Sequence, residues 1–342
     1  MANPEKLGGF KILKETALIS LAPFKSGRRP PAIFRILAEH QINLPYVTFI
    51  QSGLNGCSVN MAVEAKDART TRDLIQKSFL QSPDHFSDAA ILSIFPHRKK
   101  PAITGALFEA FGREGIHPDA MALSPSAISV VLDEQVLIRA SSSLFGPFAF
   151  GAYRTSEDWK LAQKGKEKLY KEVVASYQEK RPKVYGLEYQ DGQELLRIAL
   201  SHSHLETLGA AFEAFSRQGL DLTFLAATRS QKQPGTVDLC LPMTKRGSNR
   251  ETIARTIPQS QIEARDPVGT FSMNGPHFGD RYGIVGDLLT ALERAGVDLM
   301  GLSCTIASIT GVVPSSHLAG AIEAIQDCFD VPSIFKTDRK YG

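Results

Sequence analysis

The residues best suited to ligand chemistry lie in a glycine-containing segment, Asn274 to Ile284, that precedes a predicted helix. Gly275, Gly279 and Gly283 lose conformational entropy on folding, which tight turns or the close approach of a ligand would offset. A loop that enters a helix N-terminus offers unpaired backbone N–H groups and the positive end of the helix dipole, and both favour a carboxylate. The residues expected to contact a ligand are Asn274, Gly275, Phe278, Gly279, Asp280, Tyr282, Gly283 and Ile284.

A second candidate loop lies before the first predicted helix and carries basic side chains. It contains Lys25, Ser26 and Arg28. Lysine and arginine can pair with the carboxylate of an amino acid, although exposed basic residues are also common in solvated turns. Asp280 likewise has two interpretations, because aspartate often caps a helix and can also bind the ammonium group of a ligand. The sequence leaves both questions open.

Residue types used in metal and covalent chemistry are present, but not in a recognised arrangement. The 4 cysteines occur singly, without a Cys-x-x-Cys pair. His202 and His204 form a His-x-His pair, yet no acidic residue or cysteine follows at the spacing of a zinc site, so we expect neither metal nor cofactor. No serine, histidine and aspartate set suggests nucleophilic catalysis, and no glycine-rich phosphate loop occurs. These patterns predict a protein without enzymatic activity.

The elements that position the candidate loops come from a repeated pattern. In each copy an amphipathic segment of about three helical turns ends in glycine or a polar residue, and an extended stretch follows. Most of the turn residues are glycine, which accepts the left-handed conformation that ends a helix. The copies are Pro30 to Ile42, Thr104 to Ile116, Leu208 to Leu220 and Val285 to Val297.

Extended runs flank each predicted helix, so each unit has the order β-α-β-β-α with room for a fourth strand. Such elements bury their apolar faces as one antiparallel sheet covered by two helices, which predicts an α+β fold of four ferredoxin-like βαββαβ units. A Lys- and Glu-rich segment with the single tryptophan, Trp159, lacks this pattern and predicts a linker with a helix at Glu157 to Glu179. The predicted units span 9–82, 86–150, 185–265 and 266–335, with the charged helical linker at 151–184.

The two halves of the chain resemble each other, which predicts two tandem pairs that arose by duplication. Gln41 aligns with Gly219, and Gly115 aligns with Gly296. The fourth unit resembles an ACT domain, a small ligand-sensing module of amino-acid metabolism, and each pair resembles the C-terminal regulatory region of aspartokinases. The segments that carry the resemblance are Phe271 to Pro276, Tyr282 to Gly286 and Ala295 to Asp298.

The sequence departs from the family at positions that the resemblance links to ligand binding. The glycine before the helix is kept only in the fourth unit, as Gly283, and the serine-rich run of the family is represented by Ser124 and Ser126 and by Ser303 and Thr305. Too few residues precede the first predicted unit, which begins at 9, to form a kinase domain. The resemblance therefore implies a regulatory protein that does not itself catalyse phosphorylation.

The expected function is to bind an amino acid where ACT-like units meet and to signal this to a protein partner, such as an enzyme of amino-acid biosynthesis. The alternative is a structural or interaction module that pairs without a ligand. A second copy of the chain could join through exposed sheet edges. The net charge of +3 and the absence of a long apolar run argue against nucleic-acid and membrane partners, so a cytoplasmic location is expected.

Overall fold

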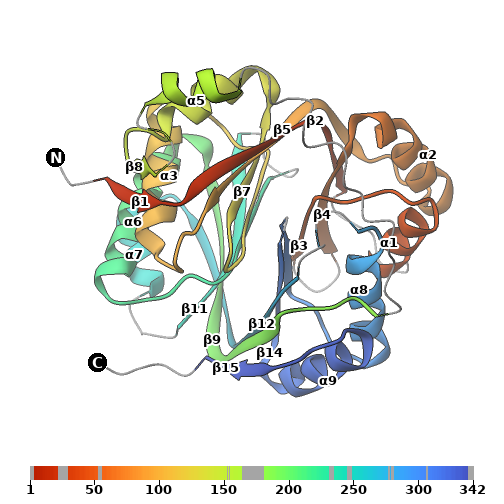
Figure 1. The fold of residues 1–342 in the computed structure, drawn as a ribbon. Coiled ribbons are helices and arrows are strands. Elements are labelled where there is room, and N and C mark those ends of the chain that lie inside the picture. The colour runs from red at the N-terminus through yellow and green to blue at the C-terminus, as the bar shows by residue number, and fades with distance from the viewer. Residues whose placement is uncertain are drawn as a thin grey trace.

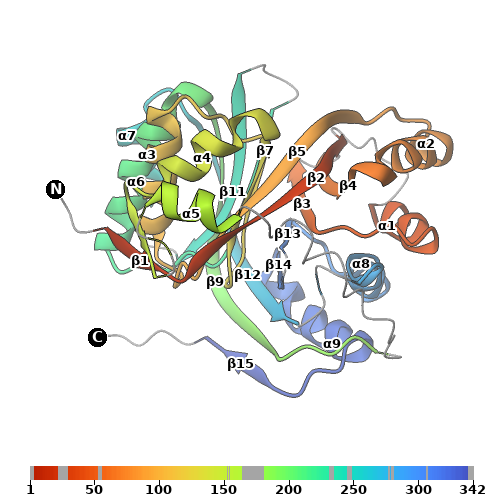
Figure 2. The same ribbon diagram turned by 45° about the horizontal axis from the view of Figure 1, so that its top comes forward.

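The computed structural model describes residues 4–21, 30–52, 56–151, 153, 155–163, 181–230, 235–244, 249–275, 278, 281–305 and 307–337. The chain has a mixed α/β fold in which strands occupy the middle and helices cover both outer sides (Figures 1 and 2). No helix in the described part of the chain is both long and apolar enough to span a membrane.

The strands divide into those before and those after the predicted linker. The first set is β1 (Glu5–Leu7), β2 (Gly9–Leu21), β3 (Tyr46–Ser52), β4 (Gly56–Glu64), β5 (Asp84–Phe95), β6 (Ala120–Leu123), β7 (Ile128–Asp133) and β8 (Phe148–Phe150). The second set is β9 (Gly186–Ser201), β10 (Leu225–Arg229), β11 (Thr236–Thr244), β12 (Gln261–Asn274), β13 (Gly301–Cys304), β14 (Ser308–Pro314) and β15 (Ile334–Lys336).

The helices follow the predicted amphipathic pattern, with a second helix after each hairpin. The α-helices are α1 (Pro30–Glu39), α2 (Ala68–Phe79), α3 (Pro101–Arg113), α4 (Leu137–Ser143), α5 (Ser156–Gln163), α6 (Leu205–Arg217), α7 (Asn249–Thr256), α8 (Ile284–Arg294) and α9 (Leu318–Cys328). The 3-10 turns are η1 (Ala65–Asp67), η2 (Glu134–Val136), η3 (His202–His204) and η4 (Ser315–His317).

Strands β1 and β8 form a separate parallel pair. The other strands join in one 13-stranded sheet rather than in a separate sheet for each predicted unit. The order is β11-β10-β6-β7-β5-β2-β4-β3-β13-β14-β12-β9-β15, and β11 also pairs with β9. The sheet therefore closes on itself, and β15 lies outside the ring. Because no edge marks where one predicted unit ends, the division into four units and a linker stays a prediction.

The sheet is continuous because long strands pair with different neighbours along their length. The first half of β2, Gly9–Leu13, pairs only with the second half of β5, whereas Thr16–Leu21 pairs with β4 on one side and with the first half of β5 on the other. An irregularity lies between the two halves, where Glu15 has a φ of 56°. An extra residue of this kind bends and twists a strand. A similar register shift separates Arg265 from Val268 in β12, so β2 and β12 pass from one layer of the sheet to the other.

The core consists of two large clusters between the sheet and the outer helices and two small clusters inside the closed sheet, where its opposite sides face each other as two layers. The larger ones bury the predicted helical stripes, such as Phe108 and Phe111 of α3 and Leu289 and Leu292 of α8. Of the small clusters, one contains Leu18, Tyr46 and Ala62. The other contains Ile50, Leu195, Phe224, Ala226, Cys240, Val268, Met300 and Val312. Alternate side chains of a strand point to opposite faces, so both faces of the sheet are packed.

Only the first part of the predicted linker helix, α5, lies within the described residues. Its Trp159 is buried in the cluster beneath α3 and α6, with its ring 5.2 Å from that of Phe10. The single tryptophan therefore belongs to the core.

Candidate functional site

The predicted glycine loop connects β12 to α8, on the side of the molecule where α1 and α8 lie next to each other (Figures 1 and 2). Asn274, Gly275 and Phe278 are described, as are Tyr282, Gly283 and Ile284. Gly279 and Asp280 lie outside the described residues, and so does the whole second candidate loop with Lys25, Ser26 and Arg28.

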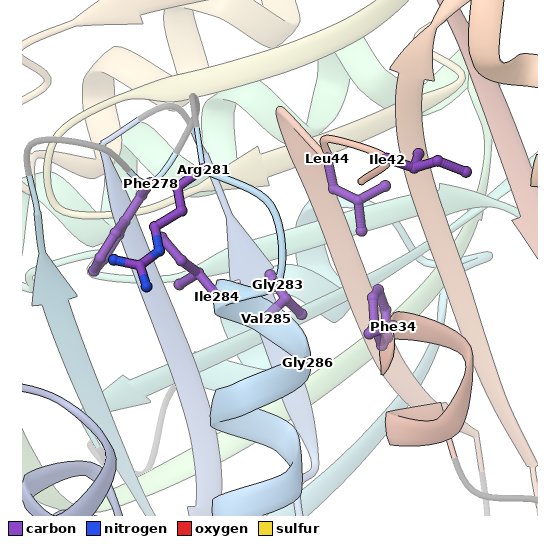
Figure 3. Close-up of a pocket in the computed structure, with 9 residues that line it drawn as sticks. All are labelled: Phe34, Ile42, Leu44, Phe278, Arg281, Gly283, Ile284, Val285 and Gly286. Carbon is purple, nitrogen blue, oxygen red and sulfur yellow. The ribbon is translucent and has the colours of Figure 1, made fainter. Parts of the chain in front are cut away.

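A pocket lies between the start of α8 and the segment from α1 to β3. Figure 3 shows Phe34 and Leu44 on one side, with Phe278 and Arg281 on the other. Strand β3 also pairs with β13, from Val47 opposite Cys304 to Ile50 opposite Gly301, so the pocket lies where segments from the first and the last quarter of the chain meet. The lining residues are Phe34, Ile42, Leu44, Phe278, Arg281, Gly283, Ile284, Val285 and Gly286.

Two glycines of the candidate loop have separate structural roles. Gly283 has a φ of 91°, in the left-handed region that favours glycine, and it caps the N-terminus of α8. A Cβ atom at Gly275 would lie 2.5 Å from Cε1 of Phe278, so the aromatic ring packs directly on the backbone. The sequence correctly singled out this loop as conformationally special, but packing accounts for Gly275 without a ligand.

Most of the residues that line the pocket are apolar, and the pocket is small. Its cavity volume is about 10 Å³, which is enough for roughly one water molecule. Arg281 is its charged lining residue. An amino acid is much larger than this cavity, so α1 and α8 would have to move apart to admit one.

A network of buried hydroxyl groups connects the end of β6 with the end of β13. Ser124 Oγ lies 3.0 Å from Thr305 Oγ1 and 2.5 Å from Ser308 Oγ. Ser126 Oγ lies 2.6 Å from Ser308 Oγ. Asn274, at the start of the candidate loop, is paired with Ser308 across the strands. The network therefore leads from the candidate loop into the opposite half of the chain.

The side chain of Asn274 is unusual, because its Oδ1 atom is buried and has no hydrogen-bond partner among the described residues. Buried polar atoms are nearly always paired, and those that are not often mark a functional position. The sequence predicted Asn274 as a ligand residue, and the structure places it beside the hydroxyl network instead of in the lining of the pocket.

His97 closes the network on the side of α3. It is fully buried, and its Nε2 atom lies 2.5 Å from the carbonyl oxygen of Ser124. A carbonyl only accepts, so Nε2 donates and carries the proton. Burial lowers the pKa of His97 to about 4, and the charge of Lys99 adds to this, whereas the hydrogen bond to Ser124 opposes it. His97 is therefore neutral at pH 7.

The contributions of His97 and Ser308 were missed by sequence reasoning. The repetition of Pro96-His97 as Pro276-His277 is the signal for His97 that the sequence offers. His277 itself lies outside the described residues. The serines and Thr305 were noticed as two separate runs, and nothing local showed that they meet.

The described residues do not bring the metal-binding side-chain types together. They contain no group of three or more His, Cys, Asp or Glu side chains that could hold a metal ion. His202 lies against His117 instead, with ring centroids 5.0 Å apart and nearly parallel planes.

Comparisons with known proteins identify the fold. No family model and no curated protein sequence matches the chain. The crystal structure of aspartate kinase from Synechocystis matches with a TM-score of 0.76 and 14% identity, over 98% of this chain and 58% of that one. The chain has a fold found in an aspartate kinase. It spans little more than half the length of that protein.

Shorter matches come from regulatory parts of the same enzyme. The ligand-free regulatory subunit of aspartate kinase from Thermus thermophilus matches with a TM-score of 0.38 and 19% identity, over 42% of this chain and 99% of that one. A putative C-terminal regulatory domain of aspartate kinase from Porphyromonas gingivalis matches with a TM-score of 0.33 and 13% identity, over 42% and 96%.

The match to the Synechocystis protein contradicts the expectation that this chain is not an enzyme. The structure that covers 98% of this chain is that of aspartate kinase, which is an enzyme. The expectation rested on missing sequence motifs and on the few residues before the first predicted unit, and neither observation addresses a fold shared with a catalyst.

Proposed function

We propose that this chain is an amino-acid-responsive regulatory protein whose ligand binds between α1 and the N-terminus of α8. The observation that supports this best is the pocket at that junction, where the left-handed Gly283, the helix N-terminus and Arg281 come together. A helix N-terminus and a guanidinium both favour a carboxylate. The proteins that share the fold are named as aspartate kinases or their regulatory parts.

In this proposal the chain contains four units of ACT type, at 9–82, 86–150, 185–265 and 266–335, with the linker at 151–184. The pairing of Gly9–Leu13 with β5 would then mean that the start of the chain supplies a strand to the second unit. The first half of β9 pairs with β12 in the same way. Units that share strands cannot move independently, so a change caused by ligand binding in one unit would also move its neighbour.

Binding would act by shifting a population between closed and open junctions. A ligand that binds only the open junction shifts the equilibrium by its difference in affinity for the two states. Movement of the loop would then reach Asn274 and Ser308, and through them Ser124 and Ser126 on the other side of the network. The readout would be a protein partner, such as an enzyme of amino-acid biosynthesis, or a second copy of this chain.

The test is calorimetric titration and thermal unfolding with each of the twenty amino acids at millimolar concentration. We expect one or a few to raise the melting temperature, because a ligand that binds the folded state stabilises it. Replacement Gly283→Ala should weaken this response at least tenfold. The matched control is Gly219→Ala, since Gly219 also has a positive φ, of 67°, and ends α6 away from the pocket.

The alternative function, a structural module that pairs without a ligand, is favoured by one observation. The pocket has a cavity volume of only about 10 Å³, and the junction is already closed by packing. If none of the amino acids stabilises the protein, this alternative replaces the proposal.

A further inference from the structure

The guanidinium group of Arg197 in β9 has no carboxylate or carbonyl partner among the described residues, and the group beside it is the weakly accepting thiol of Cys240. The Nε, Nη1 and Nη2 atoms of Arg197 are all buried and form no hydrogen bond with the described residues. An arginine remains charged inside proteins, and leaving such a charge buried and unpaired strongly destabilises the fold. A group that is retained in this state calls for a compensating anion.

The position of Arg197 shows where the anion would lie. Its neighbours Leu196 and Ile198 face the helices, in the large cluster beneath α3 and α6. Leu195 faces the opposite way, in the small cluster between the sheet layers. Because side chains alternate along a strand, Arg197 is on the same face as Leu195 and points between the layers. Its cross-strand neighbour Cys240 belongs to the same small cluster.

The surrounding groups do not neutralise the charge. Burial raises the pKa of the Cys240 thiol to about 12, so the thiol is neutral and at most a weak acceptor. Arg265 is nearby and has the same charge as Arg197. Glu263 lies opposite Arg197 on β12, and its charge partly offsets that of Arg265 at Arg197. It is exposed, however, and forms no ion pair with Arg197 among the described residues.

The duplicated half of the chain shows that the fold does not require an arginine here. The repeat aligns Ala62 with Cys240. The residue that pairs with Ala62 is Leu18, which is buried in the corresponding apolar cluster. Arg197 occupies the position of Leu18, so a charged group has replaced an ordinary core residue in one half only.

A pocket opens onto the same small cluster. It has a volume of about 350 Å³ and is lined by Ala264, Arg265, Asp266, Pro267, Val268, Met300 and Pro314. Pockets for small molecules usually have volumes from about 300 Å³ upward. Val268 and Met300 belong to the cluster that also contains Leu195 and Cys240. A small molecule that enters past Arg265 would approach the guanidinium of Arg197.

We propose that this is a second ligand site, in which a small oxyanion, a carboxylate or a phosphate, pairs with Arg197 between the sheet layers while Arg265 attracts it at the entrance. The planar guanidinium matches both groups with two parallel hydrogen bonds. This site is separate from the junction of α1 and α8, and its existence does not depend on that junction binding anything.

The test is thermal unfolding of the full chain in sodium phosphate and in sodium succinate, each compared with sodium chloride at equal ionic strength. We expect one of the two anions to raise the melting temperature by several degrees and to saturate at millimolar concentration. General salting effects do not saturate in this range. A response to phosphate alone identifies a phosphate ligand, and a response to succinate alone identifies a carboxylate.

Two variants and a control connect the effect to the site. Arg197→Leu restores the residue type of the duplicate half, so it should fold, match or exceed the melting temperature of the wild type without anion, and lose the anion response. Arg197→Lys keeps the charge without the planar fork and should weaken the apparent affinity at least tenfold. Arg69→Leu should leave the response unchanged, because the Arg69 side chain is 88% exposed on α2.

The proposal is wrong if neither anion gives a saturable shift in the wild type, or if Arg197→Leu retains the full shift. A strong loss of stability in Arg197→Leu without anion would also contradict it, because it would show that the protein already compensates this charge.

Discussion

Two pairs of neighbouring helices, α3 with α6 and α1 with α8, have the same repeated sequence pattern, but their backbones approach each other to different distances. At the first junction a Cβ atom on Gly105 would lie 2.7 Å from the carbonyl oxygen of Gly209, so the two helix backbones are in contact. At the second, a Cβ atom on Gly286 would lie 3.3 Å from the carbonyl carbon of Phe34. The repeat places Pro31 in α1 where α6 has Gly209.

The difference suggests a division of labour between the two junctions. Glycine on both helices allows backbone contact that any side chain would block, which favours a fixed clamp. Glycine on only one helix leaves a looser contact, with the small pocket at its end. We infer that the α3–α6 junction holds the molecule together while the α1–α8 junction is free to respond.

The largest expected effect is at the tight junction. Replacement Gly105→Leu should destabilise the protein by at least about 3 kcal/mol, because overpacking a closed interface displaces backbone atoms. The measurement is the free energy of unfolding in urea. Gly320→Ala in α9 is the control, since its Cβ would meet only Val297, at 3.8 Å. That variant should be neutral or gain up to about 1 kcal/mol from helix propensity. Equal losses in the free energy of unfolding for Gly105→Leu and Gly320→Ala would show that the α3–α6 junction is not especially rigid.

The pH dependence of stability tests the region of α3, because His97 precedes this helix. His97 has a pKa of about 4 in the folded protein, below the ordinary histidine value of 6.5 that applies in the unfolded chain, so the unfolded chain binds a proton more readily. The stabilisation is complete above pH 6.5 and is lost as the pH falls toward 4, by about 3 kcal/mol. His97→Gln should lack this loss while keeping a donor for Ser124. The comparison of wild type and variant from pH 7 to pH 4 isolates this histidine, and identical slopes would refute its role.

The smallest effect is expected at the looser junction. Gly286→Ala should change the free energy of unfolding by less than about 1 kcal/mol, because a modest contact with Phe34 is offset by the higher helix propensity of alanine. Urea unfolding beside Gly105→Ala, in which the Cβ meets a carbonyl oxygen at 2.7 Å, gives the direct comparison. A larger loss for Gly286→Ala than for Gly105→Ala would reverse the assignment of the two junctions.

The repeated helices could be predicted because a periodic apolar stripe is a local signal. Phe34, Phe108, Phe212 and Leu289 all lie at equivalent points and are all buried. The sharing of strands could not be predicted in the same way, because it depends on a register shift near Glu15 that only the distant partner strand reveals. A unit-by-unit interpretation therefore assigned strands to units that the continuous sheet does not separate.

The candidate site was predicted in part for a similar reason. The glycines and the polar residues of the loop are visible in sequence, and the loop does border a pocket. The contacts of Ser308 and His97 with Ser124 join residues from different repeats, so no local pattern announces them. Arg197 stands alone in an apolar run, Leu195 to Leu200, and this was a signal that sequence reasoning passed over.

The most direct test of the central claim is to fasten the α1–α8 junction with a disulfide. A Cβ atom on Gly283 would lie 3.5 Å from the Cβ atom of Ala38, a separation that a disulfide can bridge. In the double variant Ala38→Cys, Gly283→Cys, calorimetric titration with the amino acid that stabilises the wild type should show no binding when oxidised. After reduction, binding should return to the weakened level of the single variant Gly283→Cys, which is the matched control. Equal binding in both states would show that the ligand does not enter between α1 and α8.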